Sequence, residues 1–239
     1  MGRLFLVRHA QASFLSENYD QLSALGETQA HLLGEYWARR KMTFNRVCSG
    51  PAIRHRRTAQ VVGEAYLKRG LPFSGPAIVE EFDEFNGEAV LAQTLPQLLA
   101  ENAKIRELHE AMQHASSDSE RRANFQRVFE AAVSRWVDGG VVLQNAESWQ
   151  DFCTRVNRGL TAFLANSPKG EVVAIFTSGG PISVAIQRAL HLSAQDTLRI
   201  AWMARNCSFS EFLFSGDRLT LSSFNSFPHL DEDSLLTYR

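Results

Sequence analysis

Short apolar runs alternate along the chain with longer segments in which apolar residues recur every three or four positions. The strongest run is EVVAIFT at 171–177, whose β-branched and aromatic residues predict a buried strand. LFLV at 4–7 predicts a second buried strand, and 46–49 and 77–79 predict two shorter ones. Helical spacing predicts a helix over residues 22–41. Further helices are predicted over about 53–68, after a turn at Pro51, and over 181–190.

The last part of the chain predicts a β-hairpin, because 208–214 and 219–224 flank the turn Ser215–Gly216–Asp217. Gly179–Gly180 breaks the strongest strand, and Pro181 suits the first position of the helix that follows. Strands that alternate with helices predict an α/β layered domain with a mainly parallel sheet.

Residues 88–146 differ from the rest of the chain, because they contain no convincing strand. Apolar residues at helical spacing predict an amphipathic helix over 123–137, and 116–119 is polar enough to be a break. We therefore expect a single domain over 1–239 with a helical insertion at about 88–146.

The composition limits the kinds of molecule that we expect the protein to bind. The 239 residues include 25 Lys and Arg and 26 Asp and Glu, for a net charge of −1, so we expect neither a nucleic-acid partner nor a membrane surface. The three cysteines are far apart and form no CxxC, so neither a disulfide framework nor a zinc site is expected, and the cytoplasm is the expected compartment. We also expect no signal peptide, because the first apolar stretch is four residues long.

Residues suited to chemistry follow the predicted strands. In parallel sheets, ligands bind beyond the carboxyl ends of the strands. Three segments follow the second, third and fourth strands: SGPAIRHRRTAQ at 49–60, EEFDEFNGEAV at 80–90 and FTSGGPIS at 176–183. If these ends meet, the edge holds the helix N-terminus at Pro181 and the side chains Arg8, His9, an acid near Glu84, and one or more of Arg54, Arg56 and Arg57.

This set of groups suits a phosphoryl group. Guanidinium groups match phosphate oxygens in pairs, and a helix N-terminus offers unpaired N–H groups. A neutral imidazole can attack phosphorus, and a protonated carboxyl group can donate a proton to the leaving oxygen. Two arginines can neutralise the transferred group, and no His/Asp cluster has metal-ligand spacing, so no metal and no cofactor is expected.

LFLVRHAQAS at 4–13 resembles the signature of the histidine phosphatase superfamily, which includes the cofactor-dependent phosphoglycerate mutases; there the strand ends in Arg–His–Gly or Arg–His–Ala. DQLSALGETQA at 20–30 is similar to Leu-Ser/Thr-x-x-Gly-x-x-Gln-Ala, and SGPAIRHRRTA at 49–59 resembles Ser-Ser-Pro-Leu-x-Arg-Ala-x-x-Thr-Ala. Glu147–Ser148, Asn206 and the segment NSFPHL also fit the family.

The resemblance implies a three-layer α/β/α sandwich, a His9 nucleophile and a phosphate clamp of Arg8 and Arg54. Arg56 and Arg57 are then the solvated face of their helix. The family acid usually lies four residues before a glycine, which gives Asp83 when counted from Gly87. The pattern apolar-x-Glu-aromatic favours Glu84 instead, so we favour Glu84 and keep Asp83 and Glu81 as alternatives.

The sequence departs from the family at Ser178, where a histidine usually donates to the phosphoryl oxygens. A hydroxyl can donate one hydrogen bond, so Ser178 and Gly179 are expected to contact the phosphate. His229 could reach the same edge and replace the missing histidine, but we favour a structural role for it. The remaining histidines are interpreted as non-catalytic: His31, His55, His109, His114 and His191.

These observations favour a metal-independent phosphomonoester phosphatase that acts on a small phosphorylated substrate through a phospho-histidine. Phosphoglycerate-mutase-type phosphoryl transfer is an alternative, although residues 88–146 mix acids with bases and show no clear basic rim. A catalytically impaired phosphate-binding protein is another, supported by Ser178 alone. The pattern names neither the physiological substrate nor the oligomeric state.

Overall fold

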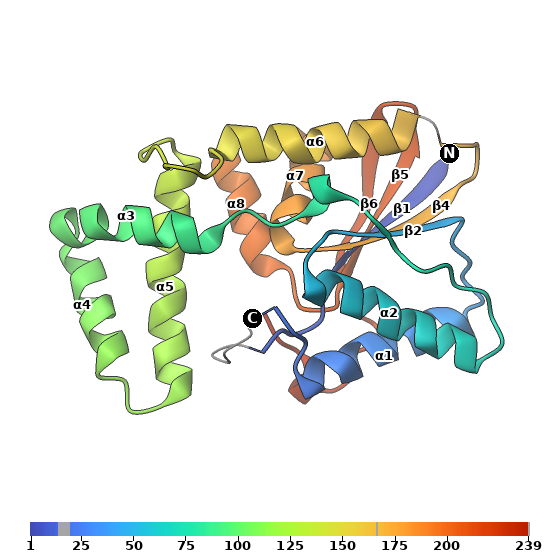
Figure 1. Ribbon diagram of the computed structural model, residues 1–239, viewed down its shortest axis with the longest axis horizontal. Helices are drawn as coiled ribbons and strands as arrows, with labels where there is room; N and C mark the ends of the chain where they lie inside the picture. The colour runs from blue at the N-terminus through green and yellow to red at the C-terminus, as the bar shows by residue number, and fades with distance from the viewer. Residues whose placement is uncertain (14–19, 166, 239) are drawn as a thin grey trace. The chain divides into compact units, whose positions relative to one another are not determined.

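The central sheet of the computed structural model is mainly parallel. Its strands are β1 (Gly2–Arg8), β2 (Arg46–Ser49), β3 (Ala77–Ile78), β4 (Val172–Thr177), β5 (Phe209–Ser215) and β6 (Arg218–Ser226). Within the described residues, 1–13, 20–165 and 167–238, the strands form one six-stranded sheet of order β3-β2-β4-β1-β5-β6 (Figure 1). Strands β1 to β4 pair in parallel, and β5 and β6 add an antiparallel hairpin beside β1. The predicted α/β fold with a mainly parallel sheet is confirmed.

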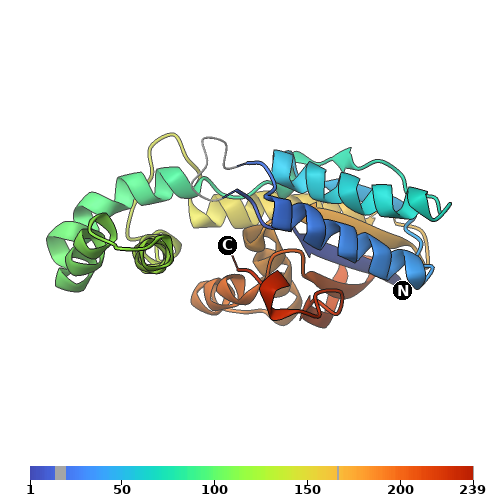
Figure 2. The same cartoon turned by 90° about the horizontal axis from the view of Figure 1, so that it is seen from below.

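The chain divides into two compact units, one of residues 1–84 and 155 onward and the other of residues 85–154. In the first unit, helices cover both faces of the sheet (Figures 1 and 2). One face carries α1 (Ala24–Arg39) and α2 (Ile53–Lys68); the other carries α7 (Gly179–Leu190) and the later turns of α6 (Trp149–Ala165). Helix α8 (Ala194–Met203) packs on α7, and two short 3₁₀ helices complete the unit at Glu80–Phe82 and Asp233–Leu235.

The core between α1, α2 and the sheet is aromatic. Trp37 of α1 is fully buried, and its ring lies 5.9 Å from that of Phe5 on β1, 4.9 Å from Phe44 and 5.5 Å from Phe209 on β5. Such edge and tilted ring contacts add to the stabilisation that comes from removing apolar area from water. This packing fixes α1 and α2 on the sheet, and α2 carries part of the site described below.

The second unit is helical. Its helices α3 (Gly87–Glu101), α4 (Ala103–Gln113) and α5 (Asp118–Val137) bury Leu98, Ile105, Leu108, Val128 and Ala132 against one another. Each helix has a polar N-cap, because Asn86, Asn102 and Ser117 accept hydrogen bonds from backbone N–H groups in the first turns. The single domain expected over 1–239 remains a prediction.

Several boundaries differ from those predicted. Helix α7 begins at Gly179, so Pro181 is its third residue and not its first. Ser117 caps α5, which therefore starts at Asp118 and not at 123. The apolar pattern did not predict α8, whose N-cap Ser193 accepts from Asp196 N.

Two further properties bear on the expected environment. No helix in the described part of the chain is both long and apolar enough to cross a membrane. Cys48, Cys153 and Cys207 are all buried and carry free thiols.

Candidate active site

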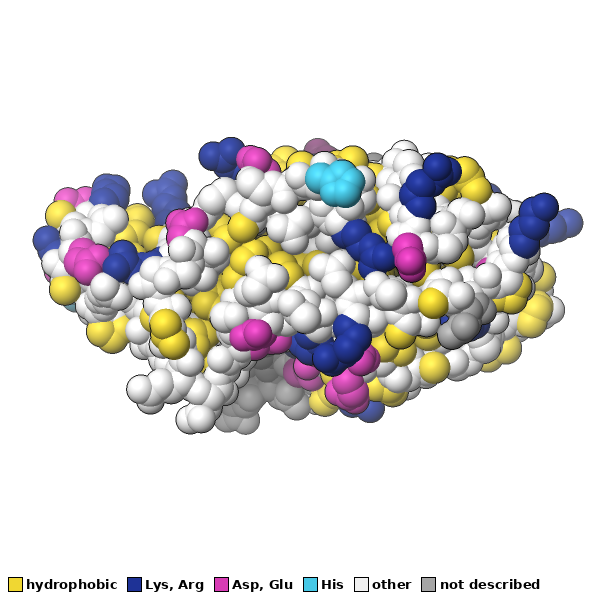
Figure 3. Space-filling model, turned by 90° about the horizontal axis from the view of Figure 1, so that it is seen from above, with side chains coloured by type: hydrophobic (Ala, Val, Ile, Leu, Met, Phe, Trp, Pro, Cys, Tyr) yellow, Lys and Arg dark blue, Asp and Glu magenta, His cyan; other side chains and the backbone are white. Residues whose placement is uncertain are grey.

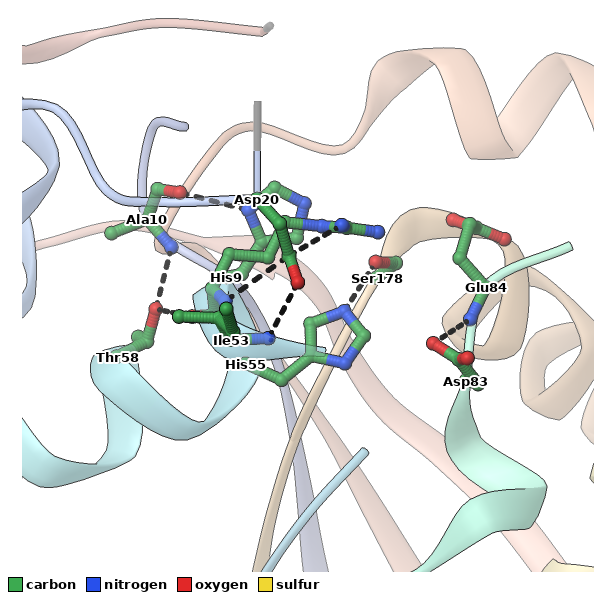
Figure 4. Close-up of polar contacts among 10 residues, drawn as sticks. His9, Ala10, Asp20, Ile53, His55, Thr58, Asp83, Glu84 and Ser178 are labelled. Carbon is green, nitrogen blue, oxygen red and sulfur yellow. Dashed lines mark hydrogen bonds and ion pairs between the residues drawn. The ribbon is translucent and has the colours of Figure 1, made fainter. Parts of the chain in front are cut away.

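The site lies at the carboxyl edge of β1 and β4. In the parallel register Arg8 is opposite Thr177, and His9 N donates to Thr177 O at 2.8 Å, so His9 and Ser178 leave the sheet side by side. Strand β2 ends beside them, because Gly50 N donates to Phe176 O at 2.9 Å. Figure 4 shows the residues that these ends and α2 bring together.

His9 is buried, with 6 % of its surface exposed, and its orientation is fixed. Its Nδ1 lies 2.8 Å from the Ala10 carbonyl oxygen, which can only accept, so Nδ1 carries the proton and Nε2 keeps its lone pair. Burial lowers the pKa of His9 well below its usual value, and the nearby Arg54, His55 and Arg8 lower it further. His9 is therefore a neutral imidazole at pH 7, the form that can act as a nucleophile.

The backbone after β1 is held by side chains from other elements. Thr58 Oγ1 on α2 accepts from Ala10 N at 3.1 Å, and Asn206 Nδ2 donates to His9 O at 3.3 Å. Gln29 on α1 accepts from Gln11 N at 2.8 Å and donates to Thr237 Oγ1 at 3.0 Å, which ties the C-terminal segment to the same loop. Three side chains, Thr58, Gln29 and Asn206, therefore hold the backbone around His9.

Arg8 is the first of the two predicted clamp residues. Its guanidinium group donates to the Ala204 carbonyl oxygen. A Cβ atom placed on Gly179 would lie 4.0 Å from Arg8 Nε, so this guanidinium lies near the start of α7. The structure thus brings Arg8 and Gly179 together, as predicted from the strand ends.

Arg54 is held by Asp20, a residue that the sequence analysis missed. Arg54 Nη1 lies 2.8 Å from Asp20 Oδ1, and the Arg54 side chain is 14 % exposed. The Asp20 carboxylate also accepts from Ile53 N at 2.8 Å and Arg54 N at 3.3 Å, and so caps α2, whose own N-cap residue, Ala52, has no polar side chain. One carboxylate therefore positions both the helix start and the guanidinium group.

The other two arginines of α2 point elsewhere. Arg56 is exposed, and Arg57 pairs with Glu27 at 2.7 Å and Glu64 at 2.8 Å. They lie on the outer face of the helix, as expected.

Among the three candidate acids, Glu84 lies at the site. Its Oε2 accepts from Gly180 N in the first turn of α7 at 3.1 Å. Asp83 instead accepts from the backbone N of Glu84 at 2.9 Å, and Glu81 lies 3.5 Å from Arg158. The geometry supports the choice of Glu84 over Asp83 and Glu81, while its role remains a prediction.

Ser178 and His55 form a contact that the sequence did not reveal. Ser178 Oγ lies 2.6 Å from His55 Nε2, and both residues are buried. The His55 ring centroid is 5.6 Å from that of His9 (Figure 4). The sequence analysis set His55 aside with the other helix histidines, whereas the structure places it beside the predicted nucleophile.

His229 packs into the core. Its ring centroid lies 6.3 Å from that of Phe209 and 6.0 Å from that of Tyr36, and the residue is 5 % exposed. These aromatic contacts support the structural role that we favoured.

His229 should make the protein sensitive to acid. Burial lowers its pKa from 6.5 to about 4, so the unfolded chain binds its proton more readily between these pH values. The stabilisation is complete above pH 6.5 and is lost as the pH falls to about 4. At 1.36 kcal/mol per pKa unit, His229 should lower the free energy of unfolding of the wild type by about 3 kcal/mol over this acid range. His229→Phe keeps the ring packing, so urea titrations of this variant should not show that part of the loss. The exposed His114→Gln serves as control, and an unchanged acid dependence in His229→Phe would contradict this assignment.

One face of the molecule carries mixed charge. On the face shown in Figure 3, Lys and Arg side chains lie among Asp and Glu side chains, in keeping with the net charge of −1. In the described ranges, no three His, Cys, Asp or Glu side chains gather in a way that could hold a metal ion. Within the site, Arg8 and Arg54 bring positive charge close to His9.

A neutral imidazole near two guanidinium groups, at a sheet edge that also holds a helix N-terminus and the Glu84 side chain, is suited to binding a phosphoryl group. The family model of the histidine phosphatase superfamily (branch 1) matches residues 4–138 and 88–226. The chain belongs to this superfamily, as its motifs implied, and is an enzyme of the phosphohydrolase class.

Solved structures share the fold. The chain resembles a phosphoserine phosphatase variant from Entamoeba histolytica in complex with phosphoserine (TM-score 0.62, 18% identity, 96% of this chain and 100% of that one). It also resembles a mycobacterial glucosyl-3-phosphoglycerate phosphatase (TM-score 0.62, 18% identity, 94% and 99%) and the alpha-ribazole phosphatase from Shigella flexneri (TM-score 0.58, 19% identity, 94% and 96%). No curated protein matches the sequence significantly.

Proposed function

We propose that this protein is a metal-independent phosphomonoester phosphatase that forms a phospho-histidine on His9. The observation that carries the proposal is the state of the His9 ring. It is neutral, its Nδ1 donates to Ala10 O at 2.8 Å, and its Nε2 lone pair is left for attack, with Arg8 and Arg54 nearby. The guanidinium groups offset the charge of the phosphoryl oxygens, so the mechanism calls on no metal ion.

In the first step, the His9 Nε2 lone pair forms a bond to phosphorus as the ester P–O bond breaks. Glu84, in its acid form, gives its proton to the departing oxygen, which leaves as an alcohol. Arg8 and Arg54 hold the non-bridging oxygens while the charge shifts.

In the second step, a water oxygen attacks phosphorus and gives a proton to the Glu84 carboxylate. The P–N bond breaks, its electron pair returns to Nε2, and inorganic phosphate leaves. Both His9 and Glu84 are then back in their starting protonation states, so the cycle is closed.

The substrate class that we propose is a small phosphorylated metabolite. The similar structures include phosphatases captured with phosphoserine and 3-phosphoglyceric acid, at 18% and 16% identity. Three buried free thiols favour the reducing cytoplasm as the compartment.

The test is to trap the intermediate. The protein is mixed with an aryl phosphate labelled in its phosphoryl group, in a buffer that contains a chelator, and quenched in alkali within milliseconds. We expect hydrolysis and an acid-labile label on the peptide that contains His9. Hydrolysis with no label at His9 would contradict the mechanism, and absence of turnover on any phosphomonoester would contradict the function.

Replacing Glu84 should affect substrates according to their leaving groups. A poor leaving group needs protonation and an activated aryl oxide does not, so Glu84→Gln should slow alkyl phosphates by on the order of 10²-fold and aryl phosphates far less. The measurement is kcat/KM for both ester types, with Asp83→Asn as the matched control. The same selective loss in Asp83→Asn and none in Glu84→Gln would move the acid to Asp83.

A further inference from the structure

The Ser178 hydroxyl does not cap helix α7, although Ser178 stands at the N-cap position. Ser178 is the N-cap residue of α7, where a serine oxygen usually accepts from the second or third N–H of the helix. Here the third residue is Pro181, which has no N–H, and the second, Gly180, donates to Glu84 Oε2 at 3.1 Å. The Ser178 side chain makes no capping hydrogen bond, and its oxygen lies 2.6 Å from His55 Nε2 instead.

His55 has room for its ring because of a glycine. A Cβ atom on Gly50 would lie 2.5 Å from His55 Nδ1 and 2.5 Å from the Phe82 carbonyl oxygen, so a side chain at position 50 would collide with both. Compared with the motifs quoted above, this chain has Gly50 for serine, His55 for alanine and Ser178 for histidine. These three departures are in contact in the structure, because the His55 ring lies between Gly50 and Ser178.

The protonation of His55 sets the direction of its hydrogen bond. Burial, with the charge of Arg54, lowers its pKa well below the usual value, so the ring is neutral and carries one N–H. Within the described residues, His55 Nδ1 is buried without a hydrogen-bond partner. A buried N–H without a partner is less tolerable than a buried acceptor without one, so the proton belongs on Nε2, from which it is donated to Ser178 Oγ.

We propose that His55 is a positioning residue which donates to Ser178 Oγ and thereby directs the Ser178 hydroxyl proton at a phosphoryl oxygen bound next to His9. The proposal rests on the phosphatase function proposed above. His9 and Ser178 leave adjacent strands together, and the His9 and His55 rings are 5.6 Å apart, so the hydroxyl lies within the same site. The imidazole that the family usually places at position 178 is supplied from α2, and it acts through a serine.

The test is a double-mutant cycle on a protein whose turnover depends on His9. Asparagine at position 55 loses the Nε2 donor, whereas the amide nitrogen of glutamine reaches about the same place. We expect His55→Asn and Ser178→Ala each to lower kcat by on the order of 10²-fold with KM little changed. His55→Gln should retain much of the activity, and His55→Asn/Ser178→Ala should be no slower than either single variant, because the pair acts as one unit. Arg56→Ala, on the exposed face of the same helix, is the control.

Affinity for orthovanadate gives a readout without turnover. Vanadate adopts the trigonal-bipyramidal geometry of phosphoryl transfer, so its affinity should fall with kcat in both single variants, and affinity for inorganic phosphate should fall less. Wild-type activity in His55→Asn, or losses that multiply in the double variant, would overturn the pairing and leave the phosphatase function standing. A wild-type protein that hydrolyses no phosphomonoester would remove the proposed function itself, while unchanged vanadate affinity in both single variants would still count against the pair.

Discussion

His9→Ala should lower kcat/KM for an aryl phosphate by on the order of 10⁴- to 10⁶-fold, the scale of loss when a covalent nucleophile is removed. The reason is geometric: Nδ1 is tied to Ala10 O at 2.8 Å, so Nε2 is the one ring atom that can reach phosphorus. No other described imidazole in the site can replace it, because His55 Nε2 is already engaged with Ser178 Oγ at 2.6 Å. The measurement is steady-state turnover on one aryl phosphate, with His229→Phe as the control.

The pH dependence of the wild type tests the same assignment independently. The pKa of His9 lies well below 6.5, so the nucleophile is deprotonated throughout the neutral range and loses activity only under more acidic conditions. We expect kcat/KM to decline on the acid side as His9 is protonated, with the midpoint of this decline below pH 6.5. Residual activity of His9→Ala within tenfold of the wild type, or an acid limb of kcat/KM centred above pH 6.5, would contradict the assignment of His9 as the nucleophile.

The centre of the sheet was predictable because β1 and β4 are buried apolar runs. Residues 46–49 and the helix at 53–68 were predicted with their observed bounds, since Pro51 marks the turn between them. Helix α8 was missed although Ser193, followed three residues later by Asp196, is a pattern typical of a helix start.

The site residues were predictable where they stand at the end of a strand. Arg8, His9 and Ser178 stand at strand ends, so the parallel topology alone brings them together. His55 could not be found in this way, because whether a helix residue faces the sheet edge depends on how α2 packs. Asp20 was missed for a related reason: its role is to cap a helix that begins more than thirty residues later, at Ile53.

Arg54→Ala should lower kcat/KM by on the order of 10²- to 10³-fold, the cost of removing one preorganised partner of a developing anion. Successive helix residues point about 100° apart, so Arg54, Arg56 and Arg57 cannot all face one phosphate. In the structure Arg54 is held by Asp20 at 2.8 Å, and Arg57 is committed to Glu27 and Glu64. Arg56→Ala and Arg57→Ala are therefore matched controls that should stay within a few-fold of the wild type.

Two further variants separate the charge of Arg54 from its placement. Arg54→Lys keeps a cation but loses the planar fork, so it should recover part of the activity and no more. Asp20→Asn keeps the arginine but weakens both the α2 cap and the ion pair, so kcat/KM should fall less than in Arg54→Ala, and the melting temperature should fall as well. The measurement is kcat/KM on one aryl phosphate beside thermal unfolding for each variant. Equal losses in Arg54→Ala, Arg56→Ala and Arg57→Ala, with unchanged melting temperatures, would rule out a specific clamp, because they would point to the summed positive charge of the helix.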